Sequence, residues 1–187
     1  CFTPIERYKK DLEREDFSYD EAQEHAVTQL QRLYDELIEW QENKQQSLIK
    51  RLFSKPVRPP KGLYFWGGVG RGKTYLVDTF YESLPIKKKW RLHFHRFMQR
   101  VHNELKQLQQ KSDPLIIVAD RIAAETDVIC FDEFFVQDIT DAMLLGKLFE
   151  YLFEREVILV ATSNIVPDDL YKNGLQRARF IPAIKLI

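Results

Sequence analysis

Residues 67–74, Gly-Gly-Val-Gly-Arg-Gly-Lys-Thr, form the stretch that decides the fold class. They match the pattern G-x-x-x-x-G-K-[ST] of a phosphate-binding loop. Glycines let such a loop turn with positive φ, so that successive N–H groups face phosphate oxygens. Lys73 supplies a positive charge for the β- and γ-phosphates, and the Thr74 hydroxyl is placed to ligate Mg²⁺. We expect the nucleotide phosphates to be bound by Gly67, Gly68, Val69, Gly70, Arg71, Gly72, Lys73 and Thr74.

The elements that such a loop requires are predicted on both sides of it. The apolar run 63–66, Leu-Tyr-Phe-Trp, predicts a short core strand. The segment 73–84 carries its apolar residues on one helical face and is followed by Pro85. This order of strand, loop and helix favours a phosphate site over an accidental match in a glycine turn.

Strands and helices alternate along the rest of the chain. The patterns predict strands over 90–95, 127–132 and 157–162, and helices over 96–110, 114–125 and 139–154. Alternation of this kind indicates a parallel sheet with helices on both faces. We therefore predict a three-layer α/β sandwich of the P-loop NTPase type.

An N-terminal helical segment precedes this core. Residues 1–17 predict one short helix, and Ser18 with Glu21 fits a capping box that begins a long amphipathic helix. Residues 41–61 are polar, basic and rich in proline, which predicts an extended linker. We place the N-terminal segment and linker at 1–55 and the nucleotide-binding core at 56–187.

Both ends of the sequence suggest a piece of a longer protein. Residue 1 is Cys rather than Met, so we expect processing or trimming that can have removed a targeting segment. At the other end, apolar residues at 180, 181, 184 and 187 have helical spacing. We expect 179–187 to be a helix and not a fifth strand. Strand 63–66 would then lie at an open, apolar edge of the sheet.

Two carboxylates are predicted to stand at the ligand-binding edge of the sheet. Four apolar residues lead directly into Asp132 and Glu133, and ligands of open α/β sheets bind at the carboxyl ends of the strands. Asp132 would hold the water shell of Mg²⁺, and Glu133 would orient and deprotonate a water. The alternative is a plain strand end with two solvated acids. The second carboxylate favours hydrolysis, because many P-loop kinases lack it.

Three further polar residues are candidates for catalysis. Asn164 follows strand 157–162, where an amide can hydrogen-bond both the γ-phosphate and the attacking water; a plain strand-end turn is the alternative. Arg177 or Arg179 stands where ring-forming NTPases place an arginine finger that reaches a neighbour's nucleotide. Two exposed arginines at a helix start are the alternative, and the sequence does not decide between Arg177 and Arg179.

Other features favour structural roles. Lys87, Lys88 and Lys89 suggest a solvated turn, and the apolar surroundings of Cys130 predict a buried thiol. His93 and His95 are expected on one face of a strand, without the cysteines or acids that a metal site needs. With 28 basic and 28 acidic residues, the composition argues against binding of nucleic acid or membrane by bulk charge.

With these motifs in order, the chain resembles the AAA+ ATPases and, more closely, the AFG-like family. The resemblance runs from about residue 18 to the end. It rests on the stretches 62–74, 92–98, 130–134, 138–144, 161–164 and 173–180.

The resemblance implies an ATPase that uses ATP and Mg²⁺, with Glu133, Asn164 and one of the two arginines in the catalytic roles above. No N-K-x-D guanine signature is present. The C-terminal lid of these proteins is absent from the chain, so the core would be incomplete. The bacterial branch implies a cytoplasmic protein that acts on FtsZ at the division ring as a homo-oligomer, and the eukaryotic branch implies a mitochondrial one. A nucleotide-gated adaptor resembling a helicase loader is the alternative, and a small-molecule kinase fits less well.

Overall fold

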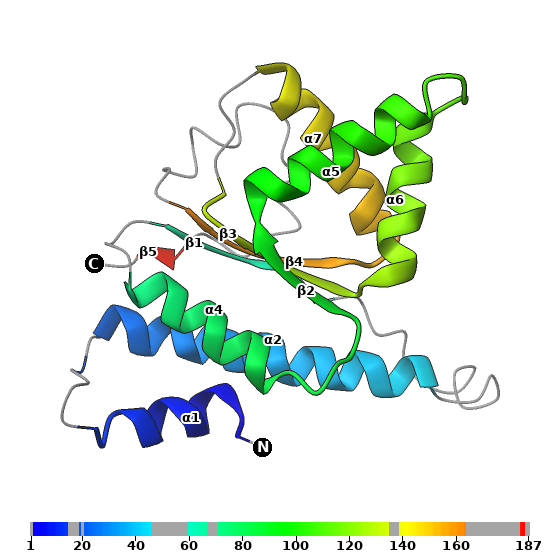
Figure 1. Ribbon diagram of the computed structural model, residues 1–187. Helices are drawn as coiled ribbons and strands as arrows, with labels where there is room; N and C mark the ends of the chain where they lie inside the picture. The colour runs from blue at the N-terminus through cyan, green and yellow to red at the C-terminus, as the bar shows by residue number, and fades with distance from the viewer. Residues whose placement is uncertain are drawn as a thin grey trace.

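A parallel sheet with helices on both faces forms the centre of the molecule (Figure 1). The computed structural model describes residues 2–14, 19, 21–45, 60–66, 71–134, 139–163 and 184–185. Within these residues the strand order is β2-β3-β4-β1-β5, and all neighbouring strands are parallel. The strands are β1 (Leu63–Trp66), β2 (Lys89–His93), β3 (Val128–Asp132), β4 (Ile158–Ser163) and β5 (Ile184–Lys185). The helices are α1 (Pro4–Asp11), α2 (Glu21–Gln45), α4 (Arg71–Ser83), α5 (Phe94–Gln107), α6 (Pro114–Glu125) and α7 (Ile139–Glu154).

Side chains that alternate along the strands build a hydrophobic core on each face of the sheet. Leu63 and Phe65 of β1 pack with α2 and α4, whereas Tyr64 packs with the core beneath α5, α6 and α7. The same alternation holds in β3, where Cys130 joins the first core and Phe131 the second. Because both faces are covered, the three-layer sandwich predicted from the sequence is confirmed.

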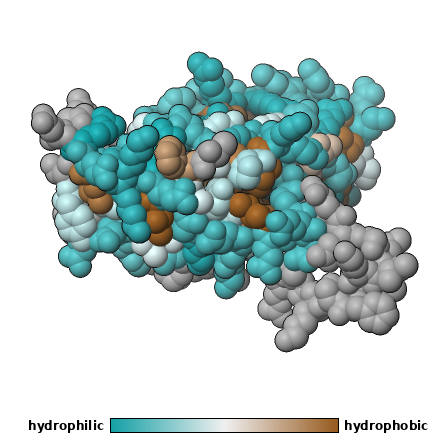
Figure 2. Space-filling model, turned by 90° about the horizontal axis from the view of Figure 1, so that it is seen from below, coloured by the Kyte–Doolittle hydropathy of each residue, from teal (hydrophilic) through white to brown (hydrophobic). Residues whose placement is uncertain are grey.

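The N-terminal helices extend the layer on the α4 side. Tyr8 of α1 and Leu30 of α2 are fully or almost fully buried in the same cluster as β1 and α4. The backbone N–H of Ile5 donates to Gln31 Oε1 at 3.0 Å, which fixes α1 on α2. Seen from below, this layer presents a mainly hydrophilic surface with small separate apolar areas (Figure 2).

Most of the predicted elements occur within one or two residues of their predicted bounds, and helices 114–125 and 139–154 match them. The strand predicted over 90–95 is the main exception within the core, because it ends at His93 and α5 begins at Phe94. Phe94, Phe97 and Val101 are buried with helical spacing, and this outweighs the short alternating pattern. His95 therefore lies on α5 and does not share a strand face with His93.

The prediction of a helix over 179–187 is wrong where the structure describes that segment. Ile184 and Lys185 form β5 and pair with Phe65 and Trp66 of β1. The open backbone groups of β1 offer hydrogen-bond partners, and this tertiary pairing overrides the helical spacing of a few apolar residues. As a result β1 lies between β4 and β5 and is not an edge strand.

The long N-terminal helix also differs from its predicted end. It continues to Gln45, so the first part of the linker predicted over 41–61 is helical. Gln41 Nε2 donates to Asp127 Oδ2 at 3.3 Å, which holds this turn against the residue before β3. The predicted N-cap Ser18 and residues 46–59 lie outside the described residues. Among the helices that are described, none has the length and apolar character to cross a bilayer.

Candidate functional site

A cavity of about 600 Å³ opens where the first turn of α4 meets the carboxyl ends of β3 and β4. Its volume is in the range that small-molecule ligands occupy, about 300–1,000 Å³. It is lined by Lys73, Thr74, Tyr75, Asp78, Arg91, His93, Asp132, Glu133, Thr162 and Ser163. The structure thus brings together Lys73 and Thr74 from the loop motif with Asp132 and Glu133 from the strand end.

Lys73 projects from the first turn of α4 toward the tip of β4. Its Nζ donates to the carbonyl oxygen of Ser163 at 3.4 Å. Partial burial lowers the pKa of Lys73, and the negative charge of Glu133 opposes this shift. A cation beside the N-terminus of a helix favours bound anions, of which phosphate is one.

Asp132 is the last residue of β3, and its side chain is only 18% exposed. The guanidinium of Arg91 contacts both of its carboxylate oxygens, with Nε to Oδ2 at 3.0 Å and Nη2 to Oδ1 at 3.5 Å. Thr74, whose side chain carries a hydroxyl, lines the same cavity. Hydroxyl and carboxylate oxygens are the ligands that Mg²⁺ prefers, and a carboxylate has lone pairs left after binding one guanidinium. The donor set therefore fits a Mg²⁺–nucleotide complex.

Glu133 has a backbone φ of 54°, in the left-handed region that residues other than glycine rarely adopt. Its side chain lines the cavity and is 85% exposed, with Oε2 3.9 Å from Nδ1 of His93. The next residue, Phe134, is buried, and its N–H donates to the Thr162 carbonyl at 2.8 Å. Ser163 Oγ donates to the Phe134 carbonyl at 2.6 Å. These bonds hold the turn in place, so that the exposed Glu133 carboxylate lies beside His93 at the end of β2.

Among the lining residues that the sequence analysis does not assign to the site, Asp78, Arg91 and His93 carry ionisable side chains. Arg91 and His93 lie on one face of β2, and Asp78 lies one helical turn after Thr74. Alternation along the strand predicts that Arg91 and His93 share a face. It does not predict which acids they meet, because that depends on the register of β2 beside β3.

The Lys87–Lys89 stretch is corrected in part. Lys87 and Lys88 are exposed ahead of β2, but Lys89 is the first residue of that strand. Its ammonium group donates to the backbone carbonyls of Tyr81 and Leu84, the latter at 3.1 Å. It therefore closes the C-terminal end of α4 and is not a solvated turn residue. Cys130 is buried as predicted, and burial raises the pKa of its thiol.

Several predicted site residues lie outside the described part of the chain. They are Gly67, Gly68, Val69, Gly70, Asn164, Arg177 and Arg179. Arg71 begins α4, and only its backbone is described. At Gly72 an added Cβ would meet nothing within 4 Å, so open space adjoins the first turn of the helix.

The chain matches known sequences along its whole length. The family described as AFG1-like ATPase matches residues 2–187. Cell division protein ZapE of Escherichia coli K12 is 55% identical over 194 residues, covering 99% of this chain and 52% of that protein. An uncharacterised protein of Schizosaccharomyces pombe is 41% identical over 217 residues, covering 99% of this chain and 48% of that protein. The chain thus spans about half the length of the curated relatives that it matches.

Solved structures of similar fold are more distant in sequence. DnaI superposes with a TM-score of 0.59 at 16% identity, covering 96% of this chain and 94% of that one. The DnaC helicase loader gives 0.58 at 15% identity, covering 97% and 99%. AMPPCP-bound DnaA from Aquifex aeolicus gives 0.56 at 16% identity, covering 92% and 49%. At such identities the likeness shows a shared fold.

Proposed function

The chain belongs to the AFG1-like ATPase family, and we propose that it binds ATP with Mg²⁺ in this cavity and hydrolyses the γ-phosphate. One observation carries the proposal. Lys73 and Thr74 from the loop motif line the same cavity as Asp132 and Glu133 from the end of β3. Phosphate binding, metal binding and water activation each need one of these groups, and all of them are within one site.

Lys73 and the start of α4 form the phosphate side of the proposed site. The lysine faces the tip of β4, where its ammonium group would neutralise phosphate charge. We propose that the loop residues Gly67, Gly68, Val69, Gly70, Arg71 and Gly72 contribute backbone N–H donors.

Thr74 and Asp132 form the metal side. Their oxygens would hold Mg²⁺ and its water shell, and the bound ion would screen the charge that develops on the phosphate oxygens. Glu133 is the proposed general base, because its exposed carboxylate follows directly on Asp132 and can accept a proton from water. We further propose that Asn164 orients that water, and that Arg177 or Arg179 reaches the site of a neighbouring subunit in a homo-oligomer.

The biological setting is proposed from the relatives. One of them is named a cell division protein, which supports a role in bacterial division for the full-length protein. We propose that this role is carried out in the cytoplasm. We propose FtsZ as the partner, on the resemblance to the bacterial branch of the family. If the protein belongs to the eukaryotic branch of the family, we propose mitochondria as its location instead.

Phosphate release by the full-length protein, measured with ATP in Mg²⁺ or in EDTA and with or without FtsZ filaments, tests this function. We expect Mg²⁺-dependent release that changes when FtsZ is present, together with co-sedimentation of the protein with the filaments. ATP binding that alters FtsZ affinity with no phosphate release would instead support a nucleotide-gated adaptor. If FtsZ does not change phosphate release and the protein does not co-sediment with the filaments, the proposed ATPase activity stands and FtsZ is excluded as the partner.

A further inference from the structure

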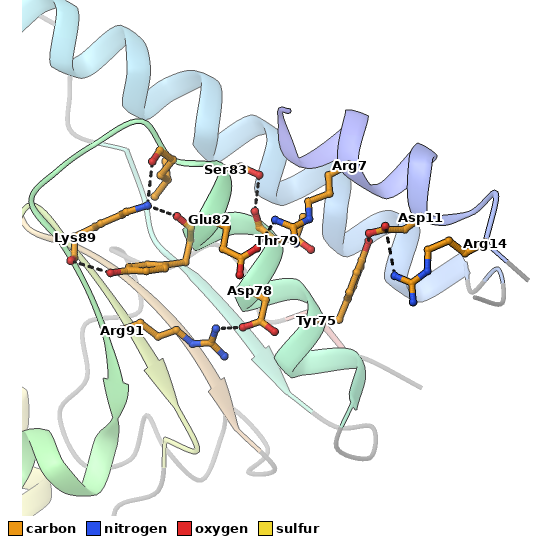
Figure 3. A network of polar contacts seen from close by, with 12 residues as sticks. Arg7, Asp11, Arg14, Tyr75, Asp78, Thr79, Glu82, Ser83, Lys89 and Arg91 are labelled. Atoms are coloured by element: carbon orange, nitrogen blue, oxygen red, sulfur yellow. Dashed lines mark hydrogen bonds and ion pairs between the residues drawn. The ribbon is translucent and has the colours of Figure 1, made fainter. Parts of the chain in front are cut away.

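The edge strand β2 presents a row of basic side chains to α4 and the cavity. Residues 89, 91 and 93 share one face of the strand, while Trp90 and Leu92 on the other face pack against the core beneath α5. Lys89 at one end holds the C-terminal carbonyls of α4, and His93 at the other end stands beside Glu133. Arg91 lies between them and points to α4, as Figure 3 shows.

Arg91 forms ion pairs with two carboxylates from different elements. One is Asp132 at the end of β3, which it contacts through Nε at 3.0 Å. The other is Asp78 of α4, which pairs with Nη1 (Figure 3). The side chains of Arg91 and Asp132 are 22% and 18% exposed, so this contact is largely withdrawn from water and is less screened than a surface pair.

The ion pair between Arg91 and Asp78 affects the site because of where Asp78 lies. Asp78 lies one turn after Thr74 on α4, so the ion pair that holds Asp78 also restricts the position of Thr74. Arg91 therefore links the helix that carries Lys73 and Thr74 to the strand that ends in Asp132. The proposed metal ligands, Thr74 and Asp132, come from these two elements.

We propose that Arg91 is a positioning residue for the Mg²⁺ end of the nucleotide site, an inference that rests on the proposed function. Mg²⁺ demands near-ideal octahedral geometry, so the Thr74 hydroxyl and the Asp132 carboxylate must keep a fixed separation. The planar guanidinium contacts both oxygens of Asp132 and thereby sets the orientation of the carboxylate. Loss of such an outer contact typically costs about 10–100-fold in metal affinity.

The test uses the full-length protein and the binding of a fluorescent ATP analogue at a series of Mg²⁺ concentrations. For Arg91→Gln we expect the half-maximal Mg²⁺ concentration to rise about tenfold or more, with affinity in EDTA within about twofold of wild type. Arg91→Lys keeps the charge without the planar fork and should give a smaller rise, as should Asp78→Asn.

Arg155→Gln is the matched control. Arg155 is 25% exposed and pairs with Asp120, away from the cavity, so its loss should leave the Mg²⁺ dependence unchanged. An unchanged half-maximal Mg²⁺ for Arg91→Gln, or equal shifts for Arg91→Gln and Arg155→Gln, would overturn the proposal. Thermal unfolding shows whether Arg91→Gln folds. If it does not fold, an unchanged half-maximal Mg²⁺ concentration for Asp78→Asn overturns the proposal. A wild-type protein that binds no analogue at any Mg²⁺ concentration would instead refute the proposed function.

Discussion

Glu133 combines an unfavourable backbone conformation with an exposed side chain. A residue other than glycine in the left-handed region costs roughly 1–3 kcal/mol and persists only where its surroundings fix it. Here Asp132 is fixed by Arg91 on one side, and Phe134 is fixed by its bonds to β4 on the other. The carboxylate lines the cavity, which is consistent with the proposed role of Glu133 as general base.

Replacing Glu133 by Gln should separate ATP binding from hydrolysis. The amide keeps the size of the side chain but cannot accept the proton, and general-base catalysis contributes about 10²–10⁴-fold. We therefore expect wild-type affinity for ATP–Mg²⁺ and a loss of phosphate release of about 100-fold or more. Glu156→Gln is the control, since Glu156 also has a positive φ, of 66°, but lies just before β4 and away from the cavity. Phosphate release above about a tenth of wild type would show that Glu133 is not the base.

For single residues, the sequence predicts the members of the known motifs better than the residue that connects them. Lys73, Thr74, Asp132 and Glu133 could be proposed from motif spacing, and the structure brings them to one cavity. Arg91 could not, because its role depends on two acids, Asp78 and Asp132, that are far from it in the sequence.

Helix α1 shows what periodicity predicts and what it leaves open at the scale of an element. A short helix was expected within residues 1–17, and α1 forms there with a capping box between Thr3 and Glu6. The sequence does not predict where α1 docks, since its few apolar residues stand among charged ones and give little indication of a partner surface. Tyr75 Oη donates to Asp11 at 2.6 Å, and burial together with this bond raises the pKa of Tyr75. Figure 3 shows α1 held to α4 at this point.

Tyr8→Ala tests whether α1 is part of the folded core. Tyr8 is 4% exposed, and removal of a large buried aromatic side chain typically costs about 3–5 kcal/mol. We expect urea denaturation to give a free energy of unfolding about 3 kcal/mol lower than that of wild type. The matched control is Phe2→Ala, because Phe2 is 49% exposed and surface changes usually stay within about 0.5 kcal/mol. Equal effects of the two changes would mean that α1 is only loosely attached.

Strand β5 shows that local sequence patterns do not always predict secondary structure. Apolar residues at helical spacing predicted a helix, yet Ile184 and Lys185 pair with β1. A strand this short has too few residues to display a period of its own. Its conformation depends on the neighbouring backbone, and no local pattern contains that information.

For the molecule as a whole, the alternation of strands and helices is sufficient to predict a parallel sheet with two covered faces. The hydrophobic segments of β1, β3 and β4 are apolar on both faces because each face meets a helical layer. The strand order places the ends of β3 and β4 beside the first turn of α4, and this arrangement creates the cavity. The similarity to DnaI at 16% identity indicates that this layout tolerates extensive change of sequence.

The central claim is that Lys73 and its neighbours in the cavity bind ATP. Isothermal titration calorimetry of the full-length protein with ATP and Mg²⁺, comparing wild type with Lys73→Ala, tests it most directly. A hydrogen bond to a charged group contributes about 1.5–3 kcal/mol, so Lys73→Ala should weaken binding at least about tenfold. Lys147→Ala, at an exposed lysine of α7 outside the cavity, should bind as wild type does. Wild-type ATP affinity in Lys73→Ala would contradict the assignment of the site.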